Sequence, residues 1–135
     1  MGAWGHDSFE NDDAGDWRYE LIESADMSTI TEALNAVTDN AISYLEAPDC
    51  AIAIAAAEVV AALHGASSAN LPADVAAWVD GKQQPDNATT LNATKAISAI
   101  LSKSELKELW EESEQDYPEW TAVMNDLIAR IPAVA

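Results

Sequence analysis

Apolar residues recur every three or four positions along most of this chain, the spacing that places them on one side of an α-helix. Stretches that alternate between apolar and polar residues, as half-buried strands do, are nearly absent. A clear helical stripe lies within residues 28–46 and contains Ile30, Leu34, Val37, Ala41, Tyr44 and Leu45. The pattern predicts an all-α protein in which a helix over 28–46 turns this stripe inward.

Residues 50–63 are apolar at every position except Glu58. Pro48 suits the first turn of a helix and Gly65 suits the position after its end, so we predict a helix over about 49–64. A helix that is apolar around most of its circumference belongs at the centre of a bundle. The alanines around Glu58 (Ala51, Ala55 and Ala62) leave two alternatives, close packing against another helix or a narrow exposed strip.

Capping residues, prolines and glycines divide the rest of the chain into further helices. We expect the first helix to start near Asn11 or Asp12, either of which can act as its cap. Further helices are expected over 72–80 and 89–102, then from a cap at Ser102, and finally from Pro118 to Pro132. The chain has 135 residues, of which 49% are hydrophobic, enough for one core. The expected fold is a single-domain bundle of about six or seven helices around the central apolar helix.

The charge balance is strongly acidic, with 24 Asp and Glu residues against 6 Lys and Arg and a formal net charge of -18. Nucleic acids and acidic membrane surfaces are therefore excluded as expected partners, because both are bound through clustered cations. The single cysteine, Cys50, excludes an internal disulfide and is interpreted as a core residue. No basic segment followed by an apolar one opens the chain, so we expect a cytoplasmic protein.

The first seventeen residues are the most distinctive part of the sequence, since two tryptophans, three glycines and several carboxylates crowd together there. Aromatic walls with a few polar groups are typical of small-molecule sites. The alternative is that the tryptophans belong to the core. The candidate ligand-binding residues are Trp4, Phe9, Glu10, Asn11, Asp12, Asp13, Asp16 and Trp17.

Three of these carboxylates are also a candidate site for a divalent cation. Asp12, Asp13 and Asp16 lie three or four residues apart, so a helix brings them to one face, and oxygen clusters suit hard cations. The spacing does not match the standard calcium-binding loop. The alternative is that these carboxylates complement the dipole at a helix start. No other cofactor is expected.

Enzymatic motifs are missing from the sequence. No nucleophile elbow surrounds a serine, and there is no glycine-rich phosphate loop. Zinc is disfavoured by a single cysteine and two histidines, His6 and His64, that are distant in the sequence. A binding role is therefore expected in preference to catalysis.

A second acidic cluster occupies residues 105–119, where Lys107 is the only cation among seven carboxylates. A dense surface of one sign attracts an oppositely charged partner and speeds its association, although such a run also serves as a plain solvated surface. The candidate partner-binding residues are Glu105, Glu108, Glu111, Glu112 and Glu114.

Several short motifs resemble a known family. Residues 1–5 read MGAWG, residues 9–14 read FENDDA and are followed by Asp16 and Trp17, and residues 104–110 read SELKELW, with Trp120 beyond them. Over the whole chain these motifs resemble a family of small bacterial proteins known as domain-of-unknown-function family 4259, whose members begin with Met-Gly-x-Trp-Gly and then Phe-(Glu or Asp)-Asn-Asp. The resemblance implies no activity.

Two functional hypotheses follow from these patterns. The first is a non-enzymatic cytoplasmic protein whose acidic surface binds a basic protein, as an immunity protein or another toxin antagonist does. The second is a module that binds a small ligand or a divalent metal ion, with a catalytic role left open, built on the N-terminal Trp, Asp and Glu residues.

Overall fold

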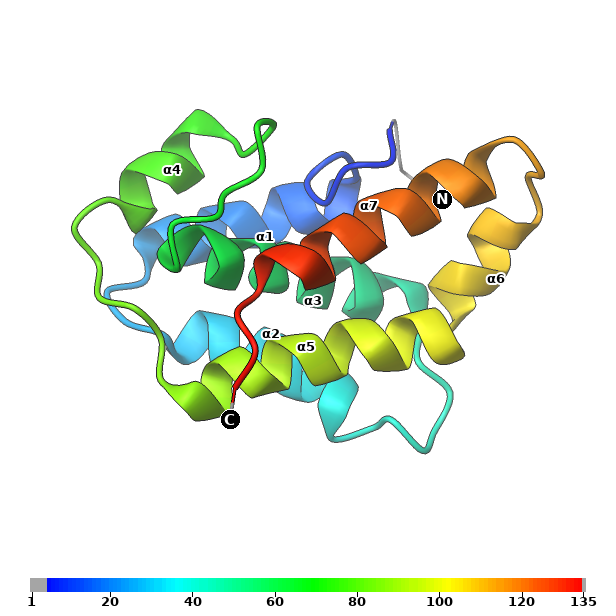
Figure 1. Ribbon diagram of the computed structural model, residues 1–135, viewed down its shortest axis with the longest axis horizontal. Helices are drawn as coiled ribbons and strands as arrows, with labels where there is room; N and C mark the ends of the chain where they lie inside the picture. The colour runs from blue at the N-terminus through cyan, green and yellow to red at the C-terminus, as the bar shows by residue number, and fades with distance from the viewer. Residues whose placement is uncertain (1–4, 135) are drawn as a thin grey trace.

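The computed structural model describes residues 5–134, and within them the chain forms seven α-helices and no strand (Figure 1). The helices are α1 (Asp12–Glu23), α2 (Ser28–Thr38), α3 (Ala47–Leu63), α4 (Ala73–Val79), α5 (Asn87–Ser102), α6 (Glu105–Glu111) and α7 (Asp116–Arg130). The prediction of an all-α bundle is confirmed.

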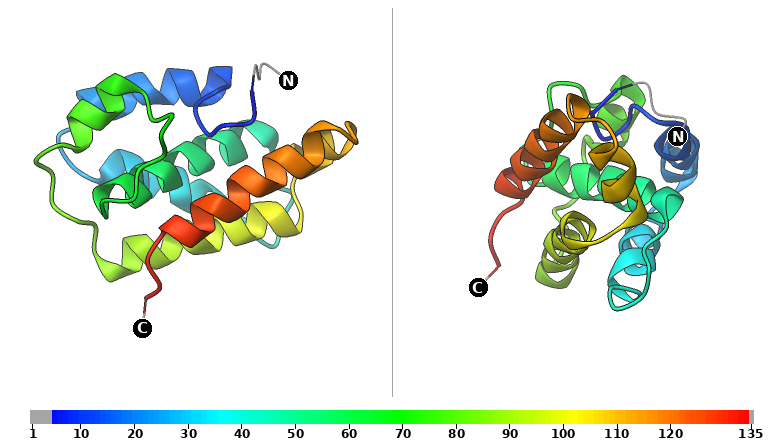
Figure 2. Two further views of the ribbon diagram at one scale, coloured as in Figure 1. Left: turned by 45° about the horizontal axis from the view of Figure 1, so that its top comes forward. Right: turned by 90° about the vertical axis from the view of Figure 1, so that its right-hand side faces the viewer.

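The predicted central helix is α3, which contacts every other helix of the bundle. In the view along its length the other helices surround it (Figure 2). Every side chain from Ala53 to Leu63 is buried, and Ala51 is buried as well. The small residues beside Glu58 therefore serve close helix packing and leave no exposed strip. Pro48 lies in the first turn, and Gly65 follows the end of α3 with a φ of +85°, which glycine adopts without strain.

Helix α2 is shorter than predicted, because it ends at Thr38 and residues 39–46 form a loop. The Asn40 side chain donates to the Ala36 carbonyl at 2.9 Å and so closes the helix end. Leu45 still reaches the core, but Ala41 and Tyr44, predicted to face inward, are exposed. Amphipathic spacing alone does not reveal that the chain turns back here to start α3.

The starts of α1 and α6 are each fixed by a side chain that accepts a hydrogen bond from a free backbone amide. Asn11 accepts from the Ala14 amide at 2.8 Å and caps α1, as predicted. The cap of α6 is Ser104, which accepts from the Lys107 amide at 3.0 Å, and not the predicted Ser102. Ser102 remains the last residue of α5, so Lys103 and Ser104 connect the two helices, where the prediction placed no residue between them.

Residues 5–10 lie over α3 and beside the first turns of α7 (Figure 2). This placement brings the N-terminal segment next to residues more than a hundred positions away. No helix in the described part of the chain is long and apolar enough to cross a lipid bilayer.

Candidate functional site

The first turn of α7 surrounds the His6 side chain with carboxylates. His6 Nε2 lies 3.1 Å from Asp116 Oδ1, and His6 Nδ1 lies 3.1 Å from Glu119 Oε2. Ser113 donates from its hydroxyl to the other oxygen of Asp116 at 3.0 Å. The His6 hydrogen bond, and secondly that of Ser113, hold the pKa of the Asp116 carboxyl below its ordinary value.

These three side chains are a group of potential metal ligands. Among residues 5–134, His6, Asp116 and Glu119 form the one set of at least three such residues whose ligand atoms lie within 4.8 Å of one another. Neither Asp116 nor Glu119 was a candidate ligand from the sequence, because 110 residues separate His6 from Asp116. We call these three residues the His6 cluster.

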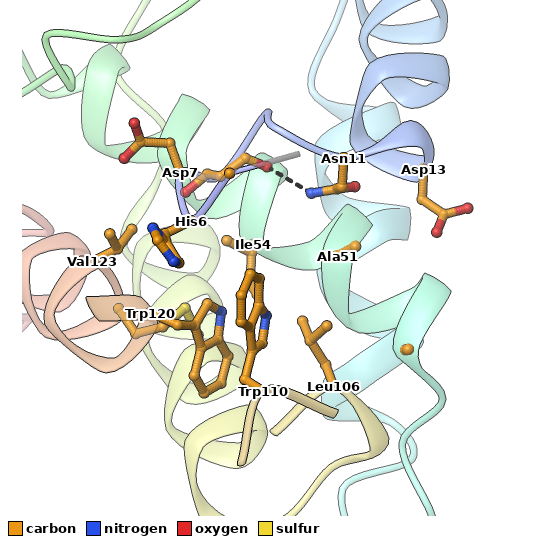
Figure 3. A pocket seen from close by; sticks show the side chains of 14 residues that line it. His6, Asp7, Asn11, Asp13, Ala51, Ile54, Leu106, Trp110, Trp120 and Val123 are labelled. Carbon is orange, nitrogen blue, oxygen red and sulfur yellow. Dashed lines mark hydrogen bonds between the residues drawn. The ribbon is translucent and has the colours of Figure 1, made fainter. Parts of the chain in front are cut away.

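A stack of aromatic rings lies directly below His6 (Figure 3). Trp110 and Trp120 have nearly parallel rings whose centroids are 6.4 Å apart, and the Trp110 ring is 5.3 Å from that of His6. The cavity beside the rings is lined by residues 5–8, by the predicted candidates Asn11 and Asp13, and by α3, α6 and α7. The cavity has a volume of about 40 Å³. It has room for about three water molecules and is far smaller than a typical ligand pocket.

A buried ion pair joins three distant parts of the chain. Glu58 of α3 is only 3% exposed, and Arg130 of α7 donates to it through two parallel bonds of 2.8 and 3.0 Å. Ser8 donates to the same carboxylate at 2.8 Å, and Arg130 donates additionally to the Ala66 carbonyl at 3.0 Å. Both oxygens of Glu58 are thus hydrogen-bonded, and the carboxylate links α3 to α7 and to residues 5–10.

A polar cleft lies on the other side of residues 7–10. Its walls include Phe9, Glu10, Arg18 and the loop around Asn70, and its volume is about 220 Å³. Glu10 accepts from the Asp7 amide at 3.2 Å, and a Cβ at Gly5 would meet its carboxylate. Glycine at position 5 therefore allows the backbone to pass close to Glu10.

The structure separates the predicted N-terminal ligand residues. Trp17 is buried in the core, Asn11 is the cap of α1, and Asp12 and Asp16 are exposed in the first turns of α1. Asp13 points away from the two stacked tryptophans (Figure 3). Phe9 and Glu10 line the polar cleft, and Trp4 lies outside the described residues. Asp12, Asp13 and Asp16 do not converge on one point in this structure as the His6 cluster does.

Most carboxylates of the second acidic cluster already have partners within the chain. Glu105 accepts from the Ala47 amide at 2.7 Å, Glu108 accepts from the Tyr44 hydroxyl at 2.9 Å, and Glu111 pairs with Lys107 at 3.2 Å. Glu112 and Glu114 are exposed. Glu105 is consequently a structural residue at the start of α3, whereas Glu108, Glu111 and Glu112 present their carboxylates on one outward face of α6.

Two exposed apolar side chains lie in the loop next to α6. Ile42 is fully exposed, and Tyr44 is 53% exposed although its hydroxyl is bonded to Glu108. This bond raises the pKa of Tyr44 to about 12, because ionisation would place two negative charges side by side. The sequence pattern did not reveal this surface, since it assigned Tyr44 to the inward side of a helix.

Cys50 is fully buried, and burial raises the pKa of its thiol to about 12. Because the thiolate is the reactive form, we expect no reaction of the native protein with Ellman's reagent at about pH 8, and one thiol per chain after unfolding in guanidinium. Rapid labelling of the folded protein would contradict the assignment of Cys50 to the core.

The residues that sequence reasoning missed are Ser8, Glu58, Arg130, Asp116 and Glu119. Glu58 carried a usable signal, because a lone charge in an apolar helix needs a partner, but nothing local identified Arg130 among the six cations. The sequence around His6 contains no such signal, because the partners of His6 come from the other end of the chain.

Comparison with family models matches residues 2–123 to the family described as Domain of unknown function (DUF4259). No curated protein and no solved structure is significantly similar to the chain. The matched range includes residues 5–10, α6 and the first turns of α7, which together build the His6 cluster and the stacked tryptophans. The motifs at the N-terminus and in α6 therefore lie within a match that covers nearly the whole chain, and this protein belongs to the DUF4259 family.

Proposed function

We propose that this protein is a cytoplasmic, non-enzymatic binding protein whose partner is a basic protein, in the manner of an immunity protein or another toxin antagonist. The proposed contact surface consists of Ile42, Tyr44, Glu108, Glu111 and Glu112, which we call the α6 surface. The observation that carries the proposal is the exposure of Tyr44 beside the carboxylate of Glu108, with the fully exposed Ile42 in the same loop.

The loop that carries the two apolar side chains is held in place. Glu105 donates its amide to the Leu45 carbonyl at 2.9 Å and accepts from the Ala47 amide at 2.7 Å. Leu45 is buried, and the hydroxyl of Tyr44 is bonded to Glu108. A preorganised aromatic side chain loses little conformational entropy on binding, which is why tyrosine is frequent among the residues that dominate interface energies.

The charge around this loop defines the chemistry of the partner. Glu108, Glu111 and Glu112 are exposed on the same side of α6, and the whole chain carries a formal charge of -18. Lysine and arginine side chains of a partner would meet these carboxylates around the apolar contact. Solvation alone accounts for the carboxylates, but it does not account for a fully exposed isoleucine two residues from Tyr44.

The test begins with a photo-crosslinking amino acid at position 42, which identifies the partner in the native host, followed by binding kinetics with the purified partner. We expect Tyr44→Ala to weaken the affinity at least about tenfold, because a central aromatic contact is lost. Tyr19→Ala is the matched control, since Tyr19 is 59% exposed on α1 and belongs to a different surface. Equal effects of the two substitutions would contradict the proposal.

A charge series tests the electrostatic part of the same proposal. Replacing Glu108, Glu111 and Glu112 by Gln is expected to lower the association rate more than it raises the dissociation rate, and to reduce the dependence on salt. The control with the same change in charge is Asp12→Asn, Asp16→Asn and Glu20→Gln, all exposed on α1. Association that is independent of salt, or a partner that is not basic, would overturn the proposal.

A further inference from the structure

We propose that the His6 cluster binds one divalent transition-metal ion of the zinc class through His6, Asp116 and Glu119. This site is separate from the α6 surface and does not depend on a protein partner. One imidazole and two carboxylates form a donor set that suits first-row divalent ions, whereas magnesium and calcium prefer oxygen ligands alone. Carboxylates of α7 thus replace the cysteines and the second histidine that the sequence lacks near His6.

The distances fit coordination by a single ion. His6 Nε2 and Asp116 Oδ1 are 3.1 Å apart, and two neighbouring ligands bound to zinc at about 2.0–2.2 Å in a tetrahedral or octahedral arrangement lie about 2.8–3.6 Å from each other. Asp116 and Glu119 are three residues apart on α7 and so project from the same side of the helix. The side chain of Glu119 is 60% exposed, which leaves it free to rotate from His6 Nδ1 onto the ion.

The surroundings hold the ligands in position. Ser113 donates to Asp116 Oδ2 at 3.0 Å, which leaves Oδ1 directed at His6. The ring of Trp110 packs at 5.3 Å from the His6 ring and restricts its rotation. Hydrogen bonds and packing of this kind orient metal ligands in characterised sites. The His6 side chain is 28% exposed, so an ion can enter directly from solvent.

Charge also favours a cation at this point. With a neutral imidazole the His6 cluster carries two negative charges, in a chain whose formal net charge is -18. A divalent ion neutralises both carboxylates, whereas a protonated His6 neutralises one. The ion would also join the N-terminal segment to α7, so metal binding is expected to stabilise the fold.

The test is calorimetric titration of Zn²⁺ into metal-free protein, together with thermal unfolding with and without Zn²⁺. We expect one ion per chain and a rise in the unfolding temperature. His6→Gln and Glu119→Gln should each weaken Zn²⁺ affinity at least about tenfold and remove the thermal shift. The matched control is Asp12→Asn with Asp16→Asn, which removes two carboxylates from the candidate cation site predicted from the sequence and should leave Zn²⁺ binding unchanged.

Tryptophan fluorescence gives a second measurement, which shows where in the protein the ion binds. Co²⁺ bound at the His6 cluster would lie close to both Trp110 and Trp120 and quench their emission, so Trp110→Phe should reduce the quenching while Zn²⁺ still binds. Far-ultraviolet circular dichroism checks the fold of each variant. If His6→Gln does not fold, the Zn²⁺ affinity of Glu119→Gln alone tests whether the ion binds at the His6 cluster. No binding at about millimolar Zn²⁺ would overturn the proposal, as would binding that survives His6→Gln and Glu119→Gln or disappears in the Asp12 and Asp16 control.

Discussion

Replacing Glu58 by alanine is expected to lower the free energy of unfolding by about 3–5 kcal/mol, because Arg130 loses its buried partner and keeps only the exposed carboxylate of Asp126. Arg130, whose side chain is 18% exposed, would lose both bonds to the carboxylate, and the buried hydroxyl of Ser8 would lose its acceptor. Urea unfolding followed by circular dichroism measures the change.

Two further variants distinguish the effect of this buried ion pair from the effect of removing any carboxylate near Arg130. Asp126→Ala removes the other carboxylate bound to Arg130, but that side chain is 67% exposed, so we expect a loss below about 1 kcal/mol. Glu58→Leu combined with Arg130→Met should recover much of the stability lost in Glu58→Ala, since an apolar pair leaves no buried charge. A small effect of Glu58→Ala would show that the buried ion pair does not hold the chain ends in place.

The second large effect is expected at Trp120, where replacement by alanine should cost about 3–5 kcal/mol. Trp120 is 3% exposed, stacks on Trp110 and lines the cavity between α3, α6 and α7. Removing its ring enlarges that cavity and takes away the stacking between Trp110 of α6 and the first turns of α7. Urea unfolding followed by far-ultraviolet circular dichroism, which does not depend on tryptophan emission, measures the loss.

Trp120→Phe is the control for this prediction, because it keeps an apolar ring in the same place and should lose clearly less stability than Trp120→Ala. Near-ultraviolet circular dichroism should change in both variants, since the stacked pair of indoles is broken. If Trp120→Ala unfolds at the same urea concentration as the natural protein, the ring contributes little to the core and is available for binding.

The helices themselves were predictable because their signals are local. The apolar run of residues 50–63 with Pro48 and Gly65 at its ends predicted α3 and its central position, and Asn11 predicted the start of α1. The length of α2 was not predictable, since the amphipathic spacing continues beyond Thr38. The loop is held by contacts of Leu45 and Ala47 with Glu105, nearly sixty positions later in the chain.

The candidate sites depend on contacts that no local pattern records. Glu58 and Arg130 are 72 residues apart, and His6 and Asp116 are 110 residues apart. Pairing over such distances is decided by how α3 and α7 cross and by where residues 5–10 lie, and both follow from the packing of the core. By itself the sequence determined the all-α class, the buried central helix and the acidic surface, because periodicity, caps and charge act between near neighbours. Only the tertiary structure decided which charges meet, because packing brings together side chains that are far apart in the chain.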